Sequence, residues 1–290
     1  MQGAILKSFT FNGGGGNGAG VILLDKEISN EKKQEIAAEI GLSETAFIFK
    51  TEENSFDVSF FTPVCQVDLC GHATIAAFYY LGKSGVIKGF NEVKKVYMNT
   101  EAGKLEVEVI FKDEVDYVLM QQQKPAFFNE LVGQDLSDVA ASLDISEQNI
   151  CLDGYDVLPT IVSTGLRDIV IPVKNRNILN SLNVNLSMIN DVSIKHNVVG
   201  YHVYTVEDKK VYARNFAPNV GIDEECATGT SNGALCSFLY NKKIISEETS
   251  VIQGEAMNEK SLIYVKVIEK DGSMDVRVGG SASILKNVII

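Results

Sequence analysis

Two segments about 155 residues apart repeat one pattern, and this internal repeat constrains the fold more than any other feature. The segments are Phe61-Thr-Pro-Val-Cys-Gln-Val-Asp-Leu-Cys70-Gly71-His72-Ala-Thr74 and Phe216-Ala-Pro-Asn-Val-Gly-Ile-Asp-Glu-Glu225-Cys226-Ala-Thr-Gly229-Thr230. Each contains Phe-x-Pro, an Asp five residues after the Pro, then a Cys and a Gly, with one residue inserted before the Cys of the second copy. Self-similarity of this kind predicts a duplicated domain.

Each repeat leads into an apolar segment, Ile75 to Leu81 in the first copy and Gly233 to Leu239 in the second. A helix that is apolar nearly all round is a buried one. We therefore expect each half to wrap a sheet around a central helix. The unpaired N–H groups and the positive end of the dipole at the start of such a helix can bind a carboxylate. We expect both helix starts to face one cleft.

The rest of the chain alternates short strand and helix patterns, which indicates an α+β fold. Ser29 is suited to cap a helix that runs to about Ile40, and Gly41 is suited to end it. Further helices are expected at 70–81, from 137 onward and at 230–240. Strands are expected at 4–10, 46–49, 58–61, 95–98, around 161 and 169, and at 210–216, 262–268, 274–278 and 283–290.

The glycine-rich run at 12–20 predicts a loop, because stacked glycines lose too much backbone entropy to lie inside an element. It contains GxGxxG, but a dinucleotide site requires a helix after this motif. The apolar run Val21-Ile-Leu-Leu24 is better suited to a strand, and no Gly-Lys-Ser/Thr follows. We therefore expect no nucleotide site.

Composition narrows the class of partner. A chain of 290 residues with 45% apolar residues can fill two domain cores. Its net charge of −12 disfavours nucleic acid and anionic membrane, so we expect a small-molecule partner. There is no apolar stretch of ~20 residues and no secretory pattern, which favours a cytoplasmic protein. The five cysteines are odd in number, so free thiols are expected.

Several short motifs, in family order across most of the chain, resemble the PhzF-like family, relatives of diaminopimelate epimerase and proline racemase. The motifs are Gly16-Asn17-Gly18-Ala19-Gly20-Val21, Leu42-Ser43-Glu44-Thr45-Ala46-Phe47, Phe61-Thr62-Pro63, Leu69-Cys70-Gly71-His72-Ala73-Thr74, Ser163-Thr164-Gly165, Arg214-Asn215-Phe216-Ala217-Pro218 and Thr228-Gly229-Thr230. The resemblance implies a diaminopimelate epimerase-like fold of two pseudo-symmetric halves, 1–124 plus 280–290 and 125–279, with the active site between them. It also implies an isomerase of a small carboxylated metabolite, no metal or organic cofactor, and commonly a homodimer.

Carried over by position, the resemblance implies which residues form the site. Glu44 matches the family's catalytic glutamate, and His72 and Glu225 are expected to take part in catalysis. The residues expected to bind substrate are Asn17, Cys70, Gly71, Cys226, Gly229 and Thr230. The chain departs from the family twice, because Glu225-Cys226 replaces the usual Asp-Pro and the Arg often found after Gln253-Gly254 is absent.

Glu44 taken alone could be a solvated carboxylate, since Glu is rarely buried. Its place between Gly41 and the apolar strand at 46–49 is compatible with partial burial. Burial would raise its pKa toward the range that suits a general acid or base. The favoured hypothesis is therefore an isomerase in which Glu44 moves the proton.

Two alternatives remain open. Cys70 and Cys226 also resemble the paired thiols of the racemases, and a thiol just before a helix has its pKa lowered, which suits a base. Inert packing of both cysteines is the plainer interpretation. The other alternative is a binding protein that kept the cleft and lost the chemistry.

His72 could relay a proton, donate a hydrogen bond to substrate or cap a helix. Two helical residues that are two positions apart do not lie on the same helix face. This argues against Cys70 and His72 as a nucleophile pair for hydrolysis. A metal site of Cys65, Cys70 and His72 lacks a second spaced pair, so no metal is expected. His196 and His202 are interpreted as structural.

Overall fold

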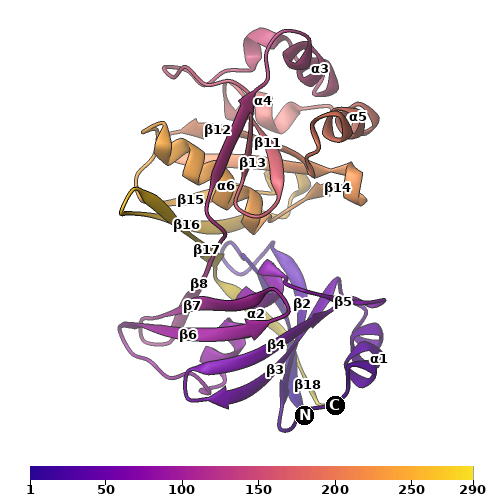
Figure 1. Ribbon diagram of the computed structural model, residues 1–290, viewed down its shortest axis with the longest axis vertical. Helices are drawn as coiled ribbons and strands as arrows, with labels where there is room; N and C mark the ends of the chain where they lie inside the picture. Colours follow the sequence, from indigo (N-terminus) through magenta and orange to yellow (C-terminus); the bar gives the residue numbers. More distant parts are fainter. Residues whose placement is uncertain (290) are drawn as a thin grey trace. The chain divides into compact units, whose positions relative to one another are not determined.

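A computed structural model describes residues 1–289, and the chain divides into two compact units (Figure 1). The N-terminal unit comprises Met1–Gln121 and the residues from Gly279 onward, and the C-terminal unit comprises Gln122–Val278. Both units combine helices with a mixed sheet, so the predicted α+β class is confirmed. Within residues 1–289, the helices are all too short or too polar to span a bilayer.

The sheet of the N-terminal unit has the strand order β18, β1, β2, β3, β4, β6, β7, β8. Neighbouring strands are antiparallel except for the parallel pairs β2/β3 and β4/β6, and β5 adds to the end of β4. The strands are β1 (Gln2–Ser8), β2 (Asn17–Leu24), β3 (Glu44–Glu52), β4 (Ser55–Phe61), β5 (Gln66–Val67), β6 (Glu92–Thr100), β7 (Gly103–Phe111), β8 (Val115–Gln121) and β18 (Ala282–Ile289).

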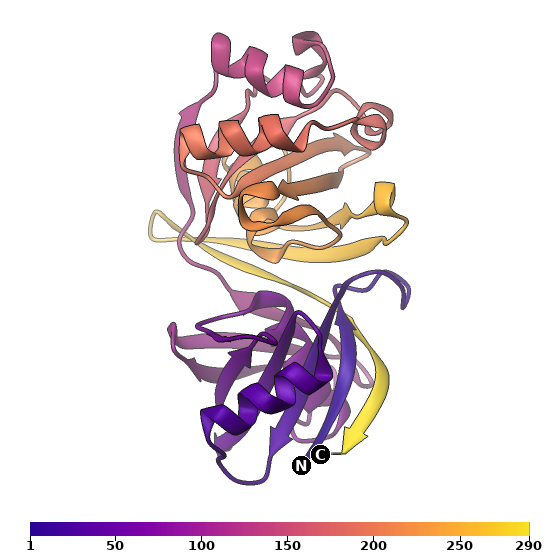
Figure 2. The same ribbon diagram turned by 90° about the vertical axis from the view of Figure 1, so that its right-hand side faces the viewer.

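Two helices accompany this sheet. Helix α1 (Asn30–Ile40) packs against β3 and β4 on the outside of the unit (indigo in Figure 2). Helix α2 (Gly71–Lys83) contacts β1, β2, β3, β7, β8 and β18, and its residues from Ala73 to Leu81 are all buried. The sheet thus wraps around α2, as the apolar run at 75–81 predicts.

The sheet of the C-terminal unit has the order β9, β10, β11, β12, β13, β15, β16, with parallel pairs β11/β12 and β13/β15. Its strands are β9 (Ala126–Glu130), β10 (Thr160–Ser163), β11 (Arg167–Pro172), β12 (Gly200–Glu207), β13 (Lys210–Ala217), β14 (Ile222–Glu225), β15 (Glu248–Gln253) and β16 (Ser261–Lys270). The helices are α3 (Gln134–Ser142), α4 (Arg176–Ser181), α5 (Leu186–His196) and α6 (Gly229–Asn241). Strand β17 (Ser273–Gly280) belongs to this unit up to Val278, and its last two residues belong to the N-terminal unit.

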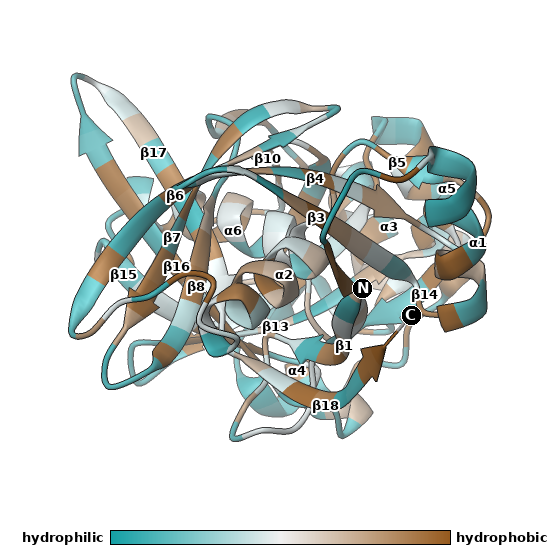
Figure 3. Cartoon of the chain, turned by 90° about the horizontal axis from the view of Figure 1, so that it is seen from below, coloured by the Kyte–Doolittle hydropathy of each residue, from teal (hydrophilic) through white to brown (hydrophobic). Residues whose placement is uncertain are grey.

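The two units repeat one topology. From β1 to β7, and again from β10 to β16, the successive pairs are antiparallel, parallel, antiparallel, parallel and antiparallel. In Figure 3, α2 and α6 carry mostly white to brown residues, which fits their burial. The sequence repeat therefore corresponds to a repeated strand–helix unit.

The second copy of the repeat contains a longer insertion before its helix than the comparison of the two segments indicates. Gly71 begins α2 and Gly229 begins α6, whereas Asp68 and Asp223 precede these starts by three and six residues. The second copy thus carries three additional residues before its helix, not one. As a result the N-cap position that Cys70 holds in the first copy is held by Thr228 in the second.

The predicted ends of α1 are confirmed, whereas the predicted loop at 12–20 is only partly correct. Ser29 accepts a hydrogen bond from Lys32 N, and Gly41 ends the helix with a φ of 68°. The predicted loop at 12–20 is wrong in its second half, because β2 already begins at Asn17. A Cβ on Gly20 would lie 2.7 Å from Thr45 Oγ1, so glycine stands there for close packing rather than for a turn.

Other helix boundaries need correction. Helix α3 begins at Gln134 rather than Ser137, directly after Gly133, whose φ of 58° starts the turn. Helices α4 and α5 were not predicted, although Asn175 and Asn185 cap them by accepting hydrogen bonds from Ile178 N and Met188 N.

Candidate active site

Three of the residues expected in the site meet in the N-terminal unit. Glu44 is the first residue of β3, Cys70 is the N-cap of α2, and His72 is the second residue of that helix. Their carboxylate, thiol and imidazole atoms all lie within 4.8 Å of one another. We call these three residues the Glu44 cluster.

His72 is the centre of the cluster. Its Nε2 lies 3.0 Å from Glu44 Oε2, and the Cys70 Sγ lies 3.6 Å from His72 Nδ1. Ser43 Oγ lies 3.4 Å from His72 Nε2 and also donates to Gly18 O. Ser43 was not singled out by the sequence analysis, although it immediately precedes Glu44.

The cluster is mostly shielded from solvent: the Glu44 and His72 side chains are 21% and 15% exposed and Cys70 is buried. Glu44 Oε2 is inaccessible, and its contact with His72 lacks the alignment of a good hydrogen bond. This oxygen therefore lies inside the cluster, beside the His72 ring.

The charges of the cluster follow from its contacts. Burial raises the pKa of Glu44, but the neighbouring His72, with Ser43 and Cys70, outweighs burial and leaves that pKa below its ordinary value. Burial likewise lowers the pKa of His72, but Cys70 and Glu44 outweigh it and hold the pKa well above 6.5. The expected rise in the Glu44 pKa is therefore wrong, because burial comes together with a cationic partner.

The contact of Cys70 with His72 corrects a second expectation. Two residues that are two apart diverge only when both lie inside one helix. Cys70 lies just outside α2 in extended backbone, with φ −137° and ψ 118°, so its side chain can reach back to the His72 ring. Cys65, by contrast, lies in an exposed turn where its backbone bonds with Thr62, and it is not part of the cluster.

The start of α2 also supplies hydrogen-bond donors. Thr74 N and Thr74 Oγ1 both donate to Cys70 O, which fixes the first turn. Among residues 1–289, no acceptor pairs with the backbone N–H groups of Gly71, His72 and Ala73. Three donors and the positive end of the helix dipole thus lie beside the cluster, where an anion is stabilised. Asn17, which was expected to bind substrate, is the first residue of β2 and directly precedes Gly18, whose carbonyl accepts a hydrogen bond from Ser43.

The corresponding loop of the C-terminal unit is fixed by polar side chains. Thr228 Oγ1 donates to Glu225 Oε2 at 2.6 Å. Gln253, at the end of β15, donates to Glu225 O at 2.7 Å and accepts from Thr228 N at 3.2 Å. Gly229 and Thr230 then begin α6, and their N–H groups have no acceptor among the described residues.

A buried polar network, which the sequence analysis missed, lies behind this loop. Asn232 donates to Gln253 Oε1 at 2.7 Å, and its Oδ1 lies 3.0 Å from His202 Nε2. Asn215 Nδ2 lies 3.2 Å from His202 Nδ1, so Nδ1 is the acceptor and Nε2 carries the proton. Burial lowers the pKa of His202 to about 4, which keeps the ring neutral.

Asp168 ends this network. It is buried on β11 and accepts a hydrogen bond of 2.5 Å from Ser231 Oγ, in the first turn of α6. Burial raises the pKa of Asp168 to about 6, against the lowering by Ser231 and by the Gly200 N–H, and the charge of Glu225 raises it further. The signal in the sequence was a lone acidic residue at the head of an apolar strand, Asp168-Ile-Val-Ile.

Cys226 is placed differently from Cys70. It is partly buried, lies two residues before the Thr228 cap, and packs beside Gly254. The two thiols therefore do not occupy equivalent positions in the two units.

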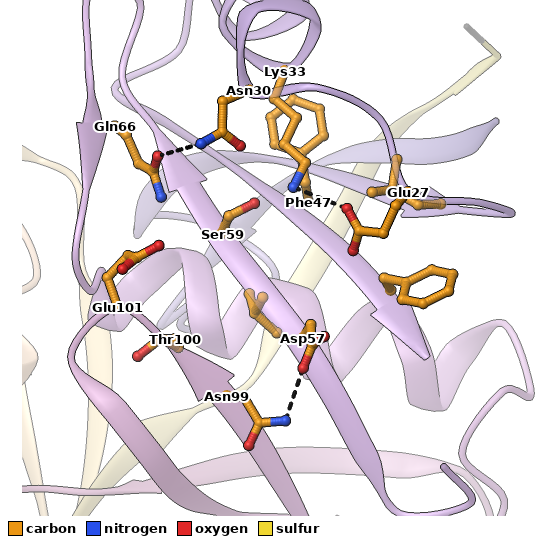
Figure 4. Close-up of a pocket in the computed structure, with 13 residues that line it drawn as sticks. Glu27, Asn30, Lys33, Phe47, Asp57, Ser59, Gln66, Asn99, Thr100 and Glu101 are labelled. Atoms are coloured by element: carbon orange, nitrogen blue, oxygen red, sulfur yellow. Dashed lines mark hydrogen bonds and ion pairs between the residues drawn. The ribbon is translucent and has the colours of Figure 1, made fainter. Parts of the chain in front are cut away.

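A hollow of about 270 Å³ lies elsewhere in the N-terminal unit, between α1 and the sheet (Figure 4). Its polar residues mainly pair with one another, as Lys33 does with Glu27 and Asn99 does with Asp57. Phe47 lines it, and since side chains alternate along a strand, Glu44 points to the opposite face of β3. The hollow is thus separate from the Glu44 cluster.

Comparisons with known proteins agree with this description. Residues 6–287 match the family described as phenazine biosynthesis-like protein. The chain is 35% identical to an uncharacterized isomerase of Clostridium acetobutylicum, over 97% of this chain and 94% of that one. The crystal structure of a PhzF-family phenazine biosynthesis protein of Bacillus anthracis has a TM-score of 0.83 at 23% identity, covering 100% and 99% of the two chains. A probable proline racemase from Agrobacterium radiobacter has a TM-score of 0.62 at 10% identity, covering 100% and 92%, which is a likeness of fold.

Proposed function

The chain belongs to the phenazine biosynthesis-like protein family and is an isomerase, and from that premise we propose that Glu44 transfers a proton on a small carboxylated metabolite without a metal or organic cofactor. The observation that carries the proposal is the Glu44 cluster. It combines a shielded carboxylate oxygen, an imidazolium 3.0 Å away and three unpaired N–H groups at the start of α2.

Glu44 begins the reaction as the base. Its lowered pKa keeps it ionised, so it can take a proton from carbon next to an electron-withdrawing group. The electron pair of the broken C–H bond moves into the adjacent unsaturated system, and the charge on oxygen is stabilised by the N–H groups of Gly71 and its neighbours. Glu44 then returns the proton to another carbon, so the product has the same atoms as the substrate.

His72 has a positioning and electrostatic role in this scheme. Its positive charge holds Glu44 ionised between turnovers, and Cys70 and Ser43 fix the ring. In the C-terminal unit, we assign Glu225 to proton transfer and Gly229 and Thr230 to substrate binding. Glu225 ends β14 and Gly229 and Thr230 begin α6, and Thr228 and Gln253 hold the loop between them in one conformation.

A second candidate function is amino-acid racemisation by the Cys70 and Cys226 thiols. The contact of Cys70 with His72 favours it, because an imidazole can take a proton from a thiol. Against it stands the position of Cys226, since Thr228 occupies the helix-cap position that Cys70 holds in the other unit.

Exchange of substrate C–H into heavy water, followed by NMR over a panel of small unsaturated carboxylates and amino acids, tests the proposal. Glu44→Gln keeps the shape of the side chain and should slow exchange by ~10² to 10⁴. Glu52→Gln, an exposed residue at the other end of β3, is the matched control and should leave the rate unchanged.

The cysteine variants separate the two candidates. Under the proposal, Cys70→Ser with Cys226→Ser should cost no more than about tenfold, because neither thiol carries the proton between carbons. Exchange that survives in Glu44→Gln and disappears in the cysteine variant would assign the chemistry to the thiols instead.

A further inference from the structure

The Glu44 cluster has a second chemical property, which does not depend on proton transfer. A carboxylate oxygen, a thiol sulfur and an imidazole nitrogen are the three kinds of donor that zinc takes in proteins. Among residues 1–289, Glu44, Cys70 and His72 are the only group of at least three such side chains close enough to share one ion.

The spacing of the donors fits a tetrahedral zinc site. Zinc binds nitrogen and oxygen at ~2.0 to 2.2 Å and sulfur at ~2.3 Å, so neighbouring donors in a tetrahedron stand roughly 3.4 to 3.6 Å apart. Here Glu44 Oε2 and His72 Nε2 are 3.0 Å apart, and Cys70 Sγ and the same nitrogen are 3.8 Å apart. These two pairs need to move by only a few tenths of an ångström, and the third pair, a Glu44 carboxylate oxygen and Cys70 Sγ, lies within 4.8 Å.

The surroundings favour capture of an ion by these three residues. The donors come from the first residue of β3 and the first turn of α2, both held by hydrogen bonds of the core. Three protein ligands also leave a fourth position open, as in zinc sites that bind water or a small ligand. The equivalent helix start of the C-terminal unit has Thr228 and Thr230 in the places of Cys70 and His72, and hydroxyl groups are poor zinc ligands.

We propose that Glu44, Cys70 and His72 together bind one Zn²⁺ ion per chain, and that the bound ion reversibly inhibits the enzyme. Inhibition follows because the ion occupies the Glu44 oxygen and the His72 nitrogen, and this second part depends on the proposed function. The ion is an inhibitor and not a cofactor, because the reaction needs the Glu44 oxygen free to accept a proton. The protons that the thiol and the imidazole carry are released to water when the ion binds.

The binding part is tested without substrate. Untagged, chelator-treated protein is titrated with Zn²⁺ by calorimetry and, in parallel, with Co²⁺ by absorbance. We expect one ion per chain at micromolar affinity or tighter, and a thiolate-to-cobalt charge-transfer band. Cys70→Ser should abolish the band, and Cys70→Ser and His72→Gln should each weaken Zn²⁺ binding by at least ~10 to 100-fold, since losing even an outer-shell partner costs that much.

Cys65→Ser is the matched control, because it removes an exposed thiol of the same unit, and it should leave both titrations unchanged. Circular dichroism establishes that each variant is folded, and two independent ligand variants keep the test valid if one is not. The site is refuted if folded Cys70→Ser and His72→Gln bind Zn²⁺ as tightly as the parent, or if the parent binds none.

The inhibition part is read separately in the heavy-water exchange assay. Exchange should fall as the ion occupies the site and recover with a chelator. If Zn²⁺ binds with these ligands while exchange continues, the inhibitory role is wrong and the site stands. If Glu44→Gln does not slow exchange, the proposed function fails, while the cobalt and calorimetric results still decide the site.

Discussion

The buried carboxylate of Asp168 gives the sharpest prediction about stability. Among residues 1–289, no cationic group lies within hydrogen-bond distance of Asp168, and a 2.5 Å hydrogen bond from Ser231 Oγ is its main compensation. Charging a carboxylate in such a place costs free energy, which the raised pKa expresses. Asp168→Asn keeps the shape and the ability to accept from Ser231, and it removes the charge.

The pKa values of Asp168 in the folded and unfolded states give the size and sign of its contribution to the free energy of unfolding. A rise from 3.8 to about 6 in the folded state corresponds to roughly 3 kcal/mol at neutral pH. Between these two values the folded state binds more protons than the unfolded state, so the free energy of unfolding falls as pH rises from about 4 to about 6, and the loss is complete above that range. Asp168→Asn lacks this loss, so its stability relative to the parent should increase by about 3 kcal/mol from pH 4 to pH 7, which corresponds to roughly 6 to 12 °C in melting temperature.

Because the chain has no Trp, unfolding is best followed by far-UV circular dichroism, at half-unit steps from pH 4 to pH 7. Asp223→Asn, an exposed carboxylate of the same unit, serves as the control and should track the parent. The difference between Asp168→Asn and the parent isolates this one group from all other titrations. A constant difference across the range would refute the assignment of a costly charge to Asp168.

Three further predictions concern the site and its scaffold. The pKa of Glu44 is lowered and that of His72 is raised, so exchange should persist as pH falls to below 4.5 and should decline only as pH rises well past 6.5, where the imidazolium is lost. The pH–rate profiles of the parent and of His72→Gln check this prediction. A fall in the exchange rate between pH 7 and pH 6 would contradict it. Gly20→Ala places a Cβ 2.7 Å from Thr45 Oγ1 and should cost about 1 to 3 kcal/mol in urea unfolding, whereas Gly14→Ala, with its nearest atom at 3.8 Å, should cost far less. Ser29→Ala removes the N-cap of α1 and should cost about 0.5 to 2 kcal/mol, which Ser29→Asp should largely restore; equal melting temperatures for the two variants would exclude capping as the reason.

The elements that sequence reasoning predicted well have local causes. Helix α1 has a Ser cap and a Gly stop on either side of its eleven residues, and the central helices have apolar runs that no surface helix would tolerate. Where it failed, a distant partner decides the conformation. Gly20 lies in a strand because Thr45 and Ile40 pack against its bare α-carbon, a contact that the glycine run itself does not disclose.

The same distinction applies to the site. Glu44, Cys70 and His72 were all named from the sequence, because short motifs carry them. The pKa shift of Glu44 was not predicted correctly, since it depends on a histidine 28 residues away along the chain coming within 3.0 Å. Asp168 and Ser231 were missed because nothing local marks a pair 63 residues apart.

The two units repeat one fold but carry different chemistry at the start of the central helix. In the N-terminal unit the cap and second helical residue are Cys70 and His72, which can hold charge and exchange protons. In the C-terminal unit they are Thr228 and Thr230, which only donate and accept hydrogen bonds, and Gln253 and Asn232 link Thr228 to a neutral His202. Since the backbone donors of both helix starts are alike, the divergence lies in the side chains alone. Under the proposed function, the start of α2 carries the charged groups that serve proton transfer, while the loop before α6 is held in one conformation by its own hydrogen bonds.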